Sequence, residues 1–309
     1  MRSTADLAAD SIRIICGPTA AGKSGIALQL ALEHGGTIVS ADSRQIYRGF
    51  DIGTAKPSWD ERRAVPHQGV DIADPSDRYS ASRWATGAIS WIEAARSRGG
   101  TPIVVGGTGF YIRALVEPLF DAPPLDPAAR SALEKFLASL PTPELERWCA
   151  ILDPARAHLG RVQLARAVET ALLSGRRLSD LQSRALPAAP VRAHYLVVDP
   201  VATLASRIES RVDAMFDAGW LNEVRALSAT VDANAPAWKA SGYRVMRAAA
   251  AGALDLSTAR ERIIIETRQY AKRQRTWFRH QLAGGHVTRL NPDDPDRPAI
   301  MERWWKESA

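Results

Sequence analysis

Short apolar runs alternate with amphipathic segments in the first third of the chain. Buried strands are expected at residues 11–16 and 37–40, with an amphipathic helix at 24–33 between them. Further on, residues 82–98 carry apolar positions at helical spacing, and residues 101–105 read as another buried strand. A strand, helix and strand in succession imply parallel pairing through a right-handed crossover. The pattern therefore predicts an α/β fold with a parallel sheet flanked by helices.

The pattern changes in the middle of the chain. Residues 121–190 are rich in Ala, Leu and Arg and contain helical patterns only, whereas residues 193–199 read as a strand again. A helical module between strands of one fold indicates an inserted domain. We expect a first core part at 1–120, a helical insertion at 121–190, a second core part at 191–285 and a loosely ordered tail at 286–309. Further helices are expected at 110–116, 201–218, 220–230, 240–250 and 258–283, and mostly loops at 44–80.

The composition narrows the class of protein. With 46% hydrophobic and 24% charged residues among 309, the chain is typical of a globular protein, which excludes a disordered or fibrous one. No apolar run approaches the roughly 18 residues of a membrane span, and the N-terminus lacks the apolar part of a secretory signal. Cys16 and Cys149 are too few for a disulfide framework or a four-ligand zinc site. We therefore expect a cytoplasmic protein without membrane contact.

The charge is unevenly distributed. Lys and Arg number 40 against 34 Asp and Glu, a net charge of +6, and most of the basic residues are arginine. The densest window, residues 260–279, holds seven basic residues against Glu261 and Glu266. Such a segment predicts a polyanionic partner. On charge alone, a solvated helix face explains it equally well.

A phosphate-binding motif lies between the first predicted strand and helix. Residues 17–24 match G-x-x-x-x-G-K-[ST], whose glycines let backbone N–H groups approach phosphate oxygens at a helix N-terminus. Lys23 supplies a cation, and the Ser24 hydroxyl is placed to bind Mg²⁺. The predicted phosphate-binding residues are Gly17, Pro18, Thr19, Ala20, Ala21, Gly22, Lys23 and Ser24.

Polar residues follow the next two strands. Ligands of open α/β sheets lie beyond the carboxyl ends of the strands, so Asp42 and Thr108 should face the phosphate site. Asp42 could hold the metal through water, act as a general base, or merely cap a turn. The predicted strand at 101–105 runs into Gly-Gly, and the one at 37–40 is separated from Asp42 by Ala41, so neither ends directly in Asp as the Walker B strand of a motor ATPase does. This favours a kinase-like transferase whose acidic residue acts on the acceptor.

Several motifs then occur in a characteristic order. They are GPTAAGKS at 17–24, SADSRQIY at 40–47, DIGTAKP at 51–57, GGTGFY at 106–111 and TRQYAKRQRTWFR at 267–279. Together they closely resemble the bacterial tRNA dimethylallyltransferases, also called tRNA isopentenyltransferases, from about Ile14 to Arg279. The resemblance implies a P-loop kinase-like fold, a helical insertion that grips the anticodon stem-loop, and a monomer.

The resemblance also implies a reaction. A dimethylallyl group would pass from dimethylallyl diphosphate to N6 of the adenosine immediately 3′ of the anticodon, with the diphosphate and Mg²⁺ at the phosphate loop. The family casts Asp42 as general base and places Thr108 near the diphosphate and the target base. Lys23 would stabilise the departing diphosphate. A P-loop kinase of small metabolites or nucleosides, and an RNA-binding ATPase without transferase activity, are the alternatives.

The same resemblance assigns tRNA contacts. They are Asp42, Ser43, Arg44, Gln45, Thr108, Arg130, Gln163, Leu164, Ala165, Arg166, Ala167, Lys239, Gly242, Tyr243, Arg244, Lys272, Arg273, Gln274, Arg275, Thr276, Trp277, Phe278 and Arg279. Residues 159–163 depart from the family's Asn-Asp-x-x-Arg element, where Arg161 could supply the lost charge. From the residues themselves, Tyr270 and Trp277 are expected in the core, and Arg207 and Arg211 either clamp the diphosphate or form a solvated face.

Overall fold

A computed structural model describes residues 11–117, 125–183, 192–282 and 285–307 of the chain. It divides into two compact units. We call Met1–Glu117 with Ala189–Ala309 the core unit, and Pro118–Ala188 the insertion unit. No helix in the described ranges is long and apolar enough to cross a membrane.

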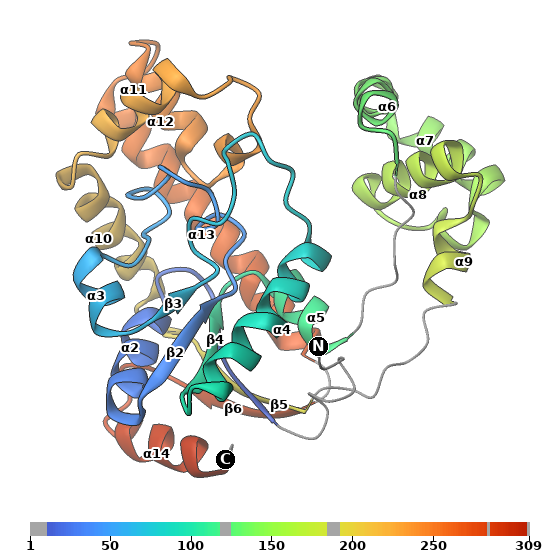
Figure 1. Ribbon diagram of the computed structural model, residues 1–309. Helices are drawn as coiled ribbons and strands as arrows, with labels where there is room; N and C mark the ends of the chain where they lie inside the picture. The colour runs from blue at the N-terminus through green and yellow to red at the C-terminus, as the bar shows by residue number, and fades with distance from the viewer. Residues whose placement is uncertain (1–10, 118–124, 184–191, 283–284, 308–309) are drawn as a thin grey trace. The chain divides into compact units, whose positions relative to one another are not determined.

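Among the described residues, six strands form one sheet in the core unit (Figure 1). The order is β3-β2-β4-β1-β5-β6, and every pairing is parallel. The strands are β1 (Ile12–Cys16), β2 (Gly36–Ser40), β3 (His67–Gln68), β4 (Thr101–Gly106), β5 (Ala193–Val198) and β6 (Gly285–Leu290). β1, β2, β4 and β5 are almost wholly buried, which explains why their sequences are continuous apolar runs. The predicted α/β class with a parallel sheet is confirmed.

Helices cover the sheet and extend beyond it. In Figure 1, α11 and α12 lie at the top of the core unit, and α13 runs from there down toward the sheet. The helices of this unit are α2 (Lys23–His34), α3 (Trp59–Ala64), α4 (Ala81–Ser97), α5 (Gly109–Val116), α10 (Leu204–Asp217), α11 (Trp220–Thr230), α12 (Tyr243–Ala250), α13 (Leu256–His280) and α14 (Arg297–Glu307), with a 3₁₀ turn at Pro236–Lys239. α3 and β3 are two elements that the loop-rich reading of 44–80 missed.

The predicted loose tail at 286–309 is wrong for the residues described there. They form β6, which pairs along its whole length with β5, and α14, whose Met301 and Trp304 are buried in the main core beside Ile15 and Leu30. Arg13 also places its guanidinium 4.2 Å from the ring centroid of Trp305. The Pro- and Asp-rich residues that suggested disorder form only the turn between β6 and α14.

The insertion unit is helical over its described residues, as its sequence predicts. It contains α6 (Pro127–Ser139), α7 (Thr142–Leu152), α8 (Arg161–Ser174) and α9 (Leu178–Ser183), with a 3₁₀ turn at Pro154–Arg156. Leu145, Leu164 and Val168 lie in its apolar core. Because this unit has a core of its own, its fold does not depend on burial elsewhere.

Candidate functional site

The phosphate loop joins the end of β1 to the start of α2. Gly17 has φ 143°, and a Cβ at this position would lie 2.1 Å from the Val198 carbonyl oxygen, so glycine is required there. The Lys23 ammonium donates to the Pro18 carbonyl at 2.6 Å, which folds the loop over the side chain. From α13, the buried Gln274 amide donates to the Gly107 carbonyl at 2.8 Å. The ends of β1 and β4 are thereby held in one rigid arrangement.

Asp42 and Thr108 lie just beyond β2 and β4, as the strand pattern predicts. Asp42 Oδ1 accepts a hydrogen bond from the Arg44 N–H at 2.8 Å. Thr108 Oγ1 accepts from the Ser43 N–H at 3.0 Å, which ties the two loops together. Within the described ranges, Asp42 Oδ2 has no hydrogen-bond partner. One carboxylate oxygen therefore fixes the turn, and the other is free to accept a proton or to bind a ligand.

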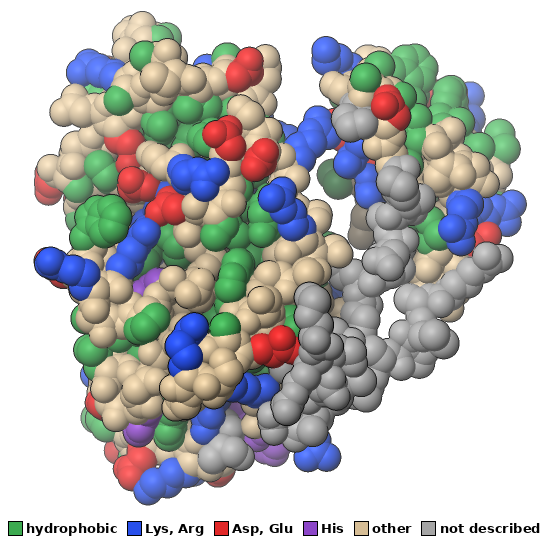
Figure 2. Space-filling view, in the orientation of Figure 1, with side chains coloured by type: hydrophobic (Ala, Val, Ile, Leu, Met, Phe, Trp, Pro, Cys, Tyr) green, Lys and Arg blue, Asp and Glu red, His purple; other side chains and the backbone are tan. Residues whose placement is uncertain are grey.

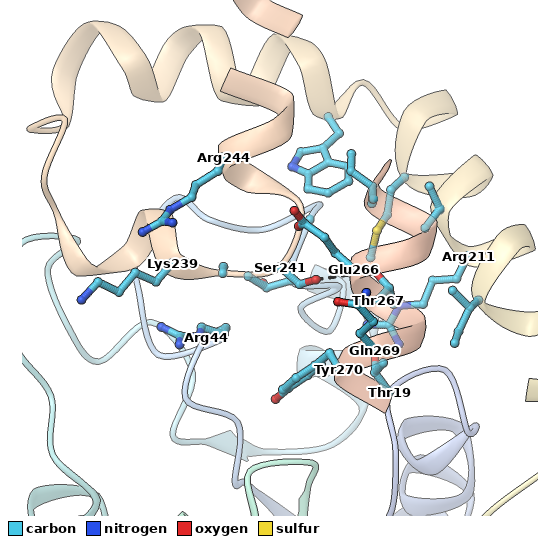
Figure 3. Close-up of a pocket in the computed structure, with 18 of the residues that line it drawn as sticks. Thr19, Arg44, Arg211, Lys239, Ser241, Arg244, Glu266, Thr267, Gln269 and Tyr270 are labelled. Atoms are coloured by element: carbon cyan, nitrogen blue, oxygen red, sulfur yellow. Dashed lines mark hydrogen bonds between the residues drawn. The ribbon is translucent and has the colours of Figure 1, made fainter. Parts of the chain in front are cut away.

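A cavity of about 530 Å³, here called the reaction pocket, opens beside Asp42. Figure 3 shows Arg44, Lys239 and Arg244 along one side of it and Arg211 entering from α10 on the other. The cationic lining contrasts with the two acids that it also contains, Asp42 and Glu266. The lining residues are Thr19, Asp42, Arg44, Gly53, Thr54, Ile208, Arg211, Val212, Met215, Trp220, Lys239, Ala240, Ser241, Arg244, Ile263, Glu266, Thr267, Gln269, Tyr270 and Arg273.

A second cavity of about 390 Å³, the phosphate groove, runs along the phosphate loop. It is lined by residues 20–25 and by Ser206, Arg207, Ser210 and Arg211 of α10. Arg211 lines both this groove and the reaction pocket. In the part of the chain that the structure describes, its guanidinium makes no hydrogen bond or ion pair. Arg207, by contrast, is held by Asp293 and by Thr203.

The electrostatics of the groove favour an anion. Burial lowers the pKa of Lys23 to about 8, the charge of Arg211 acts in the same direction, and Asp42 opposes it. Burial also lowers the pKa of Arg211. Within the residues that the structure describes, neither cation has an acidic partner in hydrogen-bonding contact, so both are costly to keep charged. An anionic ligand placed between them would remove that cost.

Known protein families and relatives resemble this chain over most of its length. The sequence model of a family described as IPP transferase matches residues 45–281, and that of a family described as Isopentenyl transferase matches residues 10–65. The chain belongs to the IPP transferase family. This confirms the resemblance drawn from the motifs. A tRNA dimethylallyltransferase of Anaeromyxobacter sp. (strain K) is 43% identical over 274 residues, which are 87% of this chain and 90% of that protein. One of Bordetella petrii is 45% identical over 281 residues, with the same coverage.

Solved structures agree with this IPP transferase fold. The tRNA isopentenylpyrophosphate transferase of Bacillus halodurans matches with a TM-score of 0.67 and 32% identity, covering 97% of this chain and 96% of that one. A eukaryotic dimethylallyltransferase, studied while acting on tRNA, matches with a TM-score of 0.78 over 97% of this chain and 80% of its own. At 24% identity, the latter shows the shared fold alone.

Some residues that the family resemblance assigned to tRNA are buried in this IPP transferase. Leu164 and Ala167 lie in the core of the insertion unit, and Tyr243 and Phe278 in that of the core unit, with relative exposures of 0 to 2%. These side chains cannot reach RNA in this structure, and their contribution is packing. Their motifs suggested contact because a sequence does not show which face of a helix a neighbouring helix covers.

Four other assigned residues have structural contacts of their own. Gln45 bonds to Ser40 and to the carbonyls of Thr54 and Ala55, so it joins loops. Gly242 has φ 81°, and a Cβ there would lie 2.5 Å from the Trp220 ring. In the insertion unit, buried Glu169 forms ion pairs with both Arg130 and Arg166.

Gln163 and Ala165 remain on α8, where the Gln163 side chain accepts from the Gly160 N–H at 3.2 Å. Arg161, which could replace the charge missing from the family's element, donates to the Leu137 and Ala138 carbonyls at the end of α6. Arg161 therefore links the start of α8 to the last turn of α6.

Tyr270 and Trp277 of α13, both expected in the core, are only half-buried. The Trp277 ring packs on the start of α5, where a Cβ at Gly109 would lie 2.3 Å from it. Tyr270, predicted in the core, lines the reaction pocket instead. Burial raises its pKa to about 12, so the phenol is protonated at neutral pH. Ser241, Thr267 and Gln269 also line the pocket, although the sequence analysis gave none of them a role; Thr267 and Gln269 belong to its motif at 267–279.

Ion pairs divide the basic residues at 260–279 into two groups, those with an acidic partner and those without one. Arg260 binds Asp213, Arg268 binds Glu209 and Arg275 binds Asp199. Across the described ranges, Arg262, Lys272, Arg273 and Arg279 have no acidic partner. Figure 2 shows basic and acidic side chains mixed over the visible face of the core unit. Unpaired cations therefore mark an anion-binding surface better than net charge does.

Proposed function

We propose that this chain transfers a dimethylallyl group from dimethylallyl diphosphate to N6 of the adenosine immediately 3′ of the anticodon in tRNA. The observation that carries the proposal is the position of Arg211, which lines both the phosphate groove and the reaction pocket. A diphosphate in the groove would have its leaving oxygen beside a base in the pocket. Names of the relatives and the shared fold support the same activity.

The groove suits an allylic diphosphate. Its C1–O bond breaks with the electron pair going to the diphosphate, while the positive charge spreads over the allyl group. Lys23, Arg211 and the N–H groups at the start of α2 would stabilise the departing charge, and they need no rearrangement to do so. The phosphate loop thus holds a leaving group here and has no need to hydrolyse ATP.

The donor set near the loop fits Mg²⁺ bound mainly through the substrate. No group of three or more His, Cys, Asp or Glu side chains that could hold a metal lies within the described residues. Mg²⁺ commonly takes one or two protein ligands together with phosphate oxygens and water, and Ser24 offers an exposed hydroxyl at the N-terminus of α2. When bound there, Mg²⁺ would neutralise charge on the diphosphate.

Asp42 is placed to receive the proton. The amino group of adenine is a weak nucleophile because its lone pair is delocalised into the ring. As the N6–C1 bond forms, N6 loses a proton, and Asp42 Oδ2 would accept it as general base. Oδ1 stays bonded to the Arg44 N–H, so the carboxylate keeps its orientation. Thr108 holds the neighbouring Ser43 in place.

The lining of the pocket suits an RNA nucleotide. Arg44, Lys239, Arg244 and Arg273 have no acidic partner among the described residues and would supply cations for phosphates. A base turned out of its stack would enter beside Tyr270. The anticodon stem-loop as the bound element, a monomeric state and a cytoplasmic location complete the proposal. The two buried, unpaired cysteines support a reducing compartment.

Incubation with labelled dimethylallyl diphosphate, tRNA and Mg²⁺, followed by nucleoside analysis, tests the proposal. We expect label in N6-modified adenosine. No label with active tRNA would overturn the proposal. Formation of ADP from ATP with a small acceptor would instead support the kinase alternative.

A further inference from the structure

A second basic cavity lies between α11 and α12 and is separate from the phosphate groove. It has a volume of about 490 Å³ and is lined by Arg225, Ser228, Arg244, Arg247 and the alanines 248, 250 and 251. We call it the arginine cleft. No acidic side chain belongs to its lining. Three guanidinium groups therefore face a shallow, small-residue surface with no counter-charge built into it.

The three arginines are held differently. Arg247 donates to the Ala233 carbonyl at 2.9 Å and stacks on Trp238, with its guanidinium carbon 4.4 Å from the ring centroid. It is thereby fixed in place with most of its donors unused. Arg225 and Arg244 are exposed, and within the structure's described ranges neither has a hydrogen bond or an ion pair. Many exposed arginines elsewhere do have partners, including Arg63, Arg113 and Arg147.

The arginine cleft continues from the reaction pocket. Arg244 lines both cavities, and Lys239 and Arg44 lie near it along the same side of the pocket (Figure 3). A chain of phosphates that passes Arg244 would reach Arg225 and Arg247 next. Guanidinium forks match phosphate oxygens in pairs, which suits an anion repeated along a backbone better than a single carboxylate.

We propose that the arginine cleft binds the phosphodiester backbone of the RNA adjoining the nucleotide that enters the reaction pocket. Arg225 and Arg247 would contact phosphates beyond the one at Arg244. The proposal rests on the proposed function, since it requires an RNA nucleotide in the pocket. It adds a site that contributes to the affinity for RNA and to the position of the RNA along the protein, without touching the reacting atoms.

Charge substitutions in the arginine cleft test this. Arg225→Glu and Ser228→Glu each place an acid there, and neither removes a contact that holds the fold. Arg98→Glu is the matched control, because Arg98 is exposed and follows α4 at the edge where the strands begin. Arg225→Lys keeps the charge and should retain most of the affinity. Kd for tRNA is measured over a series of salt concentrations, and Kd for dimethylallyl diphosphate is measured separately.

We expect both cleft variants to raise the tRNA Kd by about five- to tenfold at moderate salt, Arg225→Glu because it loses a charge-assisted hydrogen bond and Ser228→Glu because the added carboxylate repels phosphates. In Arg225→Glu the slope of log Kd against log salt should fall by about 1, as for one lost phosphate contact. Dimethylallyl diphosphate should bind as in the wild type, and Arg98→Glu should leave both constants unchanged.

Three outcomes contradict the proposal. Equal tRNA Kd and salt slope in Arg225→Glu and Arg98→Glu would remove the arginine cleft from RNA binding. A loss of polyglutamate binding with tRNA binding intact would assign it to an acidic protein partner. If the wild-type protein transfers the prenyl group normally while either of these two results is found, the proposed function stands. A wild-type protein that binds no tRNA would overturn both the proposed function and the role of the arginine cleft.

Discussion

The backbone N–H of Thr19 donates to Oε1 of Gln274 at 2.8 Å, across 255 positions of sequence. The same side chain binds Gly107 through its amino group, so one residue of α13 satisfies a donor of the phosphate loop and an acceptor after β4. Gln274 is 7% exposed. A residue from the motif assigned to RNA thus maintains the shape of the diphosphate site.

Replacing Gln274 should therefore destabilise the core unit. Gln274→Leu keeps the volume but leaves the Thr19 N–H and the Gly107 carbonyl buried without partners, a loss of about 2–4 kcal/mol. Denaturant unfolding measures it. Lys272→Ala, on the exposed face of the same helix, should change the free energy of unfolding by less than about 0.5 kcal/mol. Equal stability in both variants would show that water satisfies the two groups.

Asp42→Asn should separate catalysis from binding. The amide oxygen still accepts from the Arg44 N–H, so the turn is preserved, but the side chain no longer takes up a proton. We expect kcat to fall by about 10²–10⁴, the usual contribution of a general base, with tRNA affinity largely retained. Single-turnover transfer and a binding titration measure the two effects. Near-normal turnover would remove Asp42 from the mechanism.

Lys23 predicts a pH dependence of diphosphate binding. Its pKa of about 8 means that the charged form is lost as pH rises through 8, so the Kd for dimethylallyl diphosphate should increase above that pH. Without tRNA no transfer occurs, and calorimetry at pH 7 to 9 reports binding alone. Lys23→Arg is the control, since guanidinium stays charged over this range and its profile should be flat.

Stability should respond to Lys23 in the opposite direction. Between pH 8 and the ordinary lysine value near 10.5, the unfolded chain binds this proton more tightly than the folded one. The contribution of Lys23 to the free energy of unfolding therefore rises with pH in that window. If diphosphate binding weakened as the pH rose and the contribution of this side chain to the free energy of unfolding fell as well, Lys23 would not be the group that titrates.

Trp304 tests the ordered C-terminal segment. It is 2% exposed and packs in the main core, so Trp304→Ala should lower the free energy of unfolding by about 3–5 kcal/mol. Trp304→Phe should cost less, because it also removes an indole N–H that has no hydrogen-bond partner in the described ranges. Lys306→Ala, exposed on the same helix, is the control. A loose tail would make all three variants equally stable.

Lys272 and Arg275 should differ in their effect on tRNA. Lys272 is exposed and unpaired among the described residues, so Lys272→Ala should reduce the salt slope of tRNA binding by about 1. Arg275 is bound to Asp199 at 2.9 Å, so Arg275→Ala should mainly lower stability. Equal changes of slope in the two variants would indicate that the Arg275 pair opens when RNA binds.

Much of the core could be predicted because its sequence signals are local. Strands buried on both faces appear as apolar runs, and Asp42 and Thr108 lie just beyond β2 and β4, the positions that the strand pattern predicts. Tyr270 and Phe278, eight positions apart on one helix, could not be separated in this way. The first lines a pocket and the second is buried, and this depends on which neighbours α13 meets.

The charge pattern had a similar limit. The sequence shows that residues 260–279 are basic, but ion pairs with Asp213, Glu209 and Asp199 come from distant segments. Such partners lie beyond any window of sequence. For the same reason, only the three-dimensional structure shows that Arg211 and Arg225 have no acidic partner in its described ranges.

The position of β1 at the centre of the sheet has a consequence during translation. It lies between β4 and β5, and the Gly17 turn is packed against Val198. Because β1 precedes both of its partner strands, it must wait for residues made about 90 and 180 positions later, and Gln274 follows later still. Non-local parallel pairing of this kind is slow. A nascent chain would gain a working diphosphate site only after Gln274 has been made.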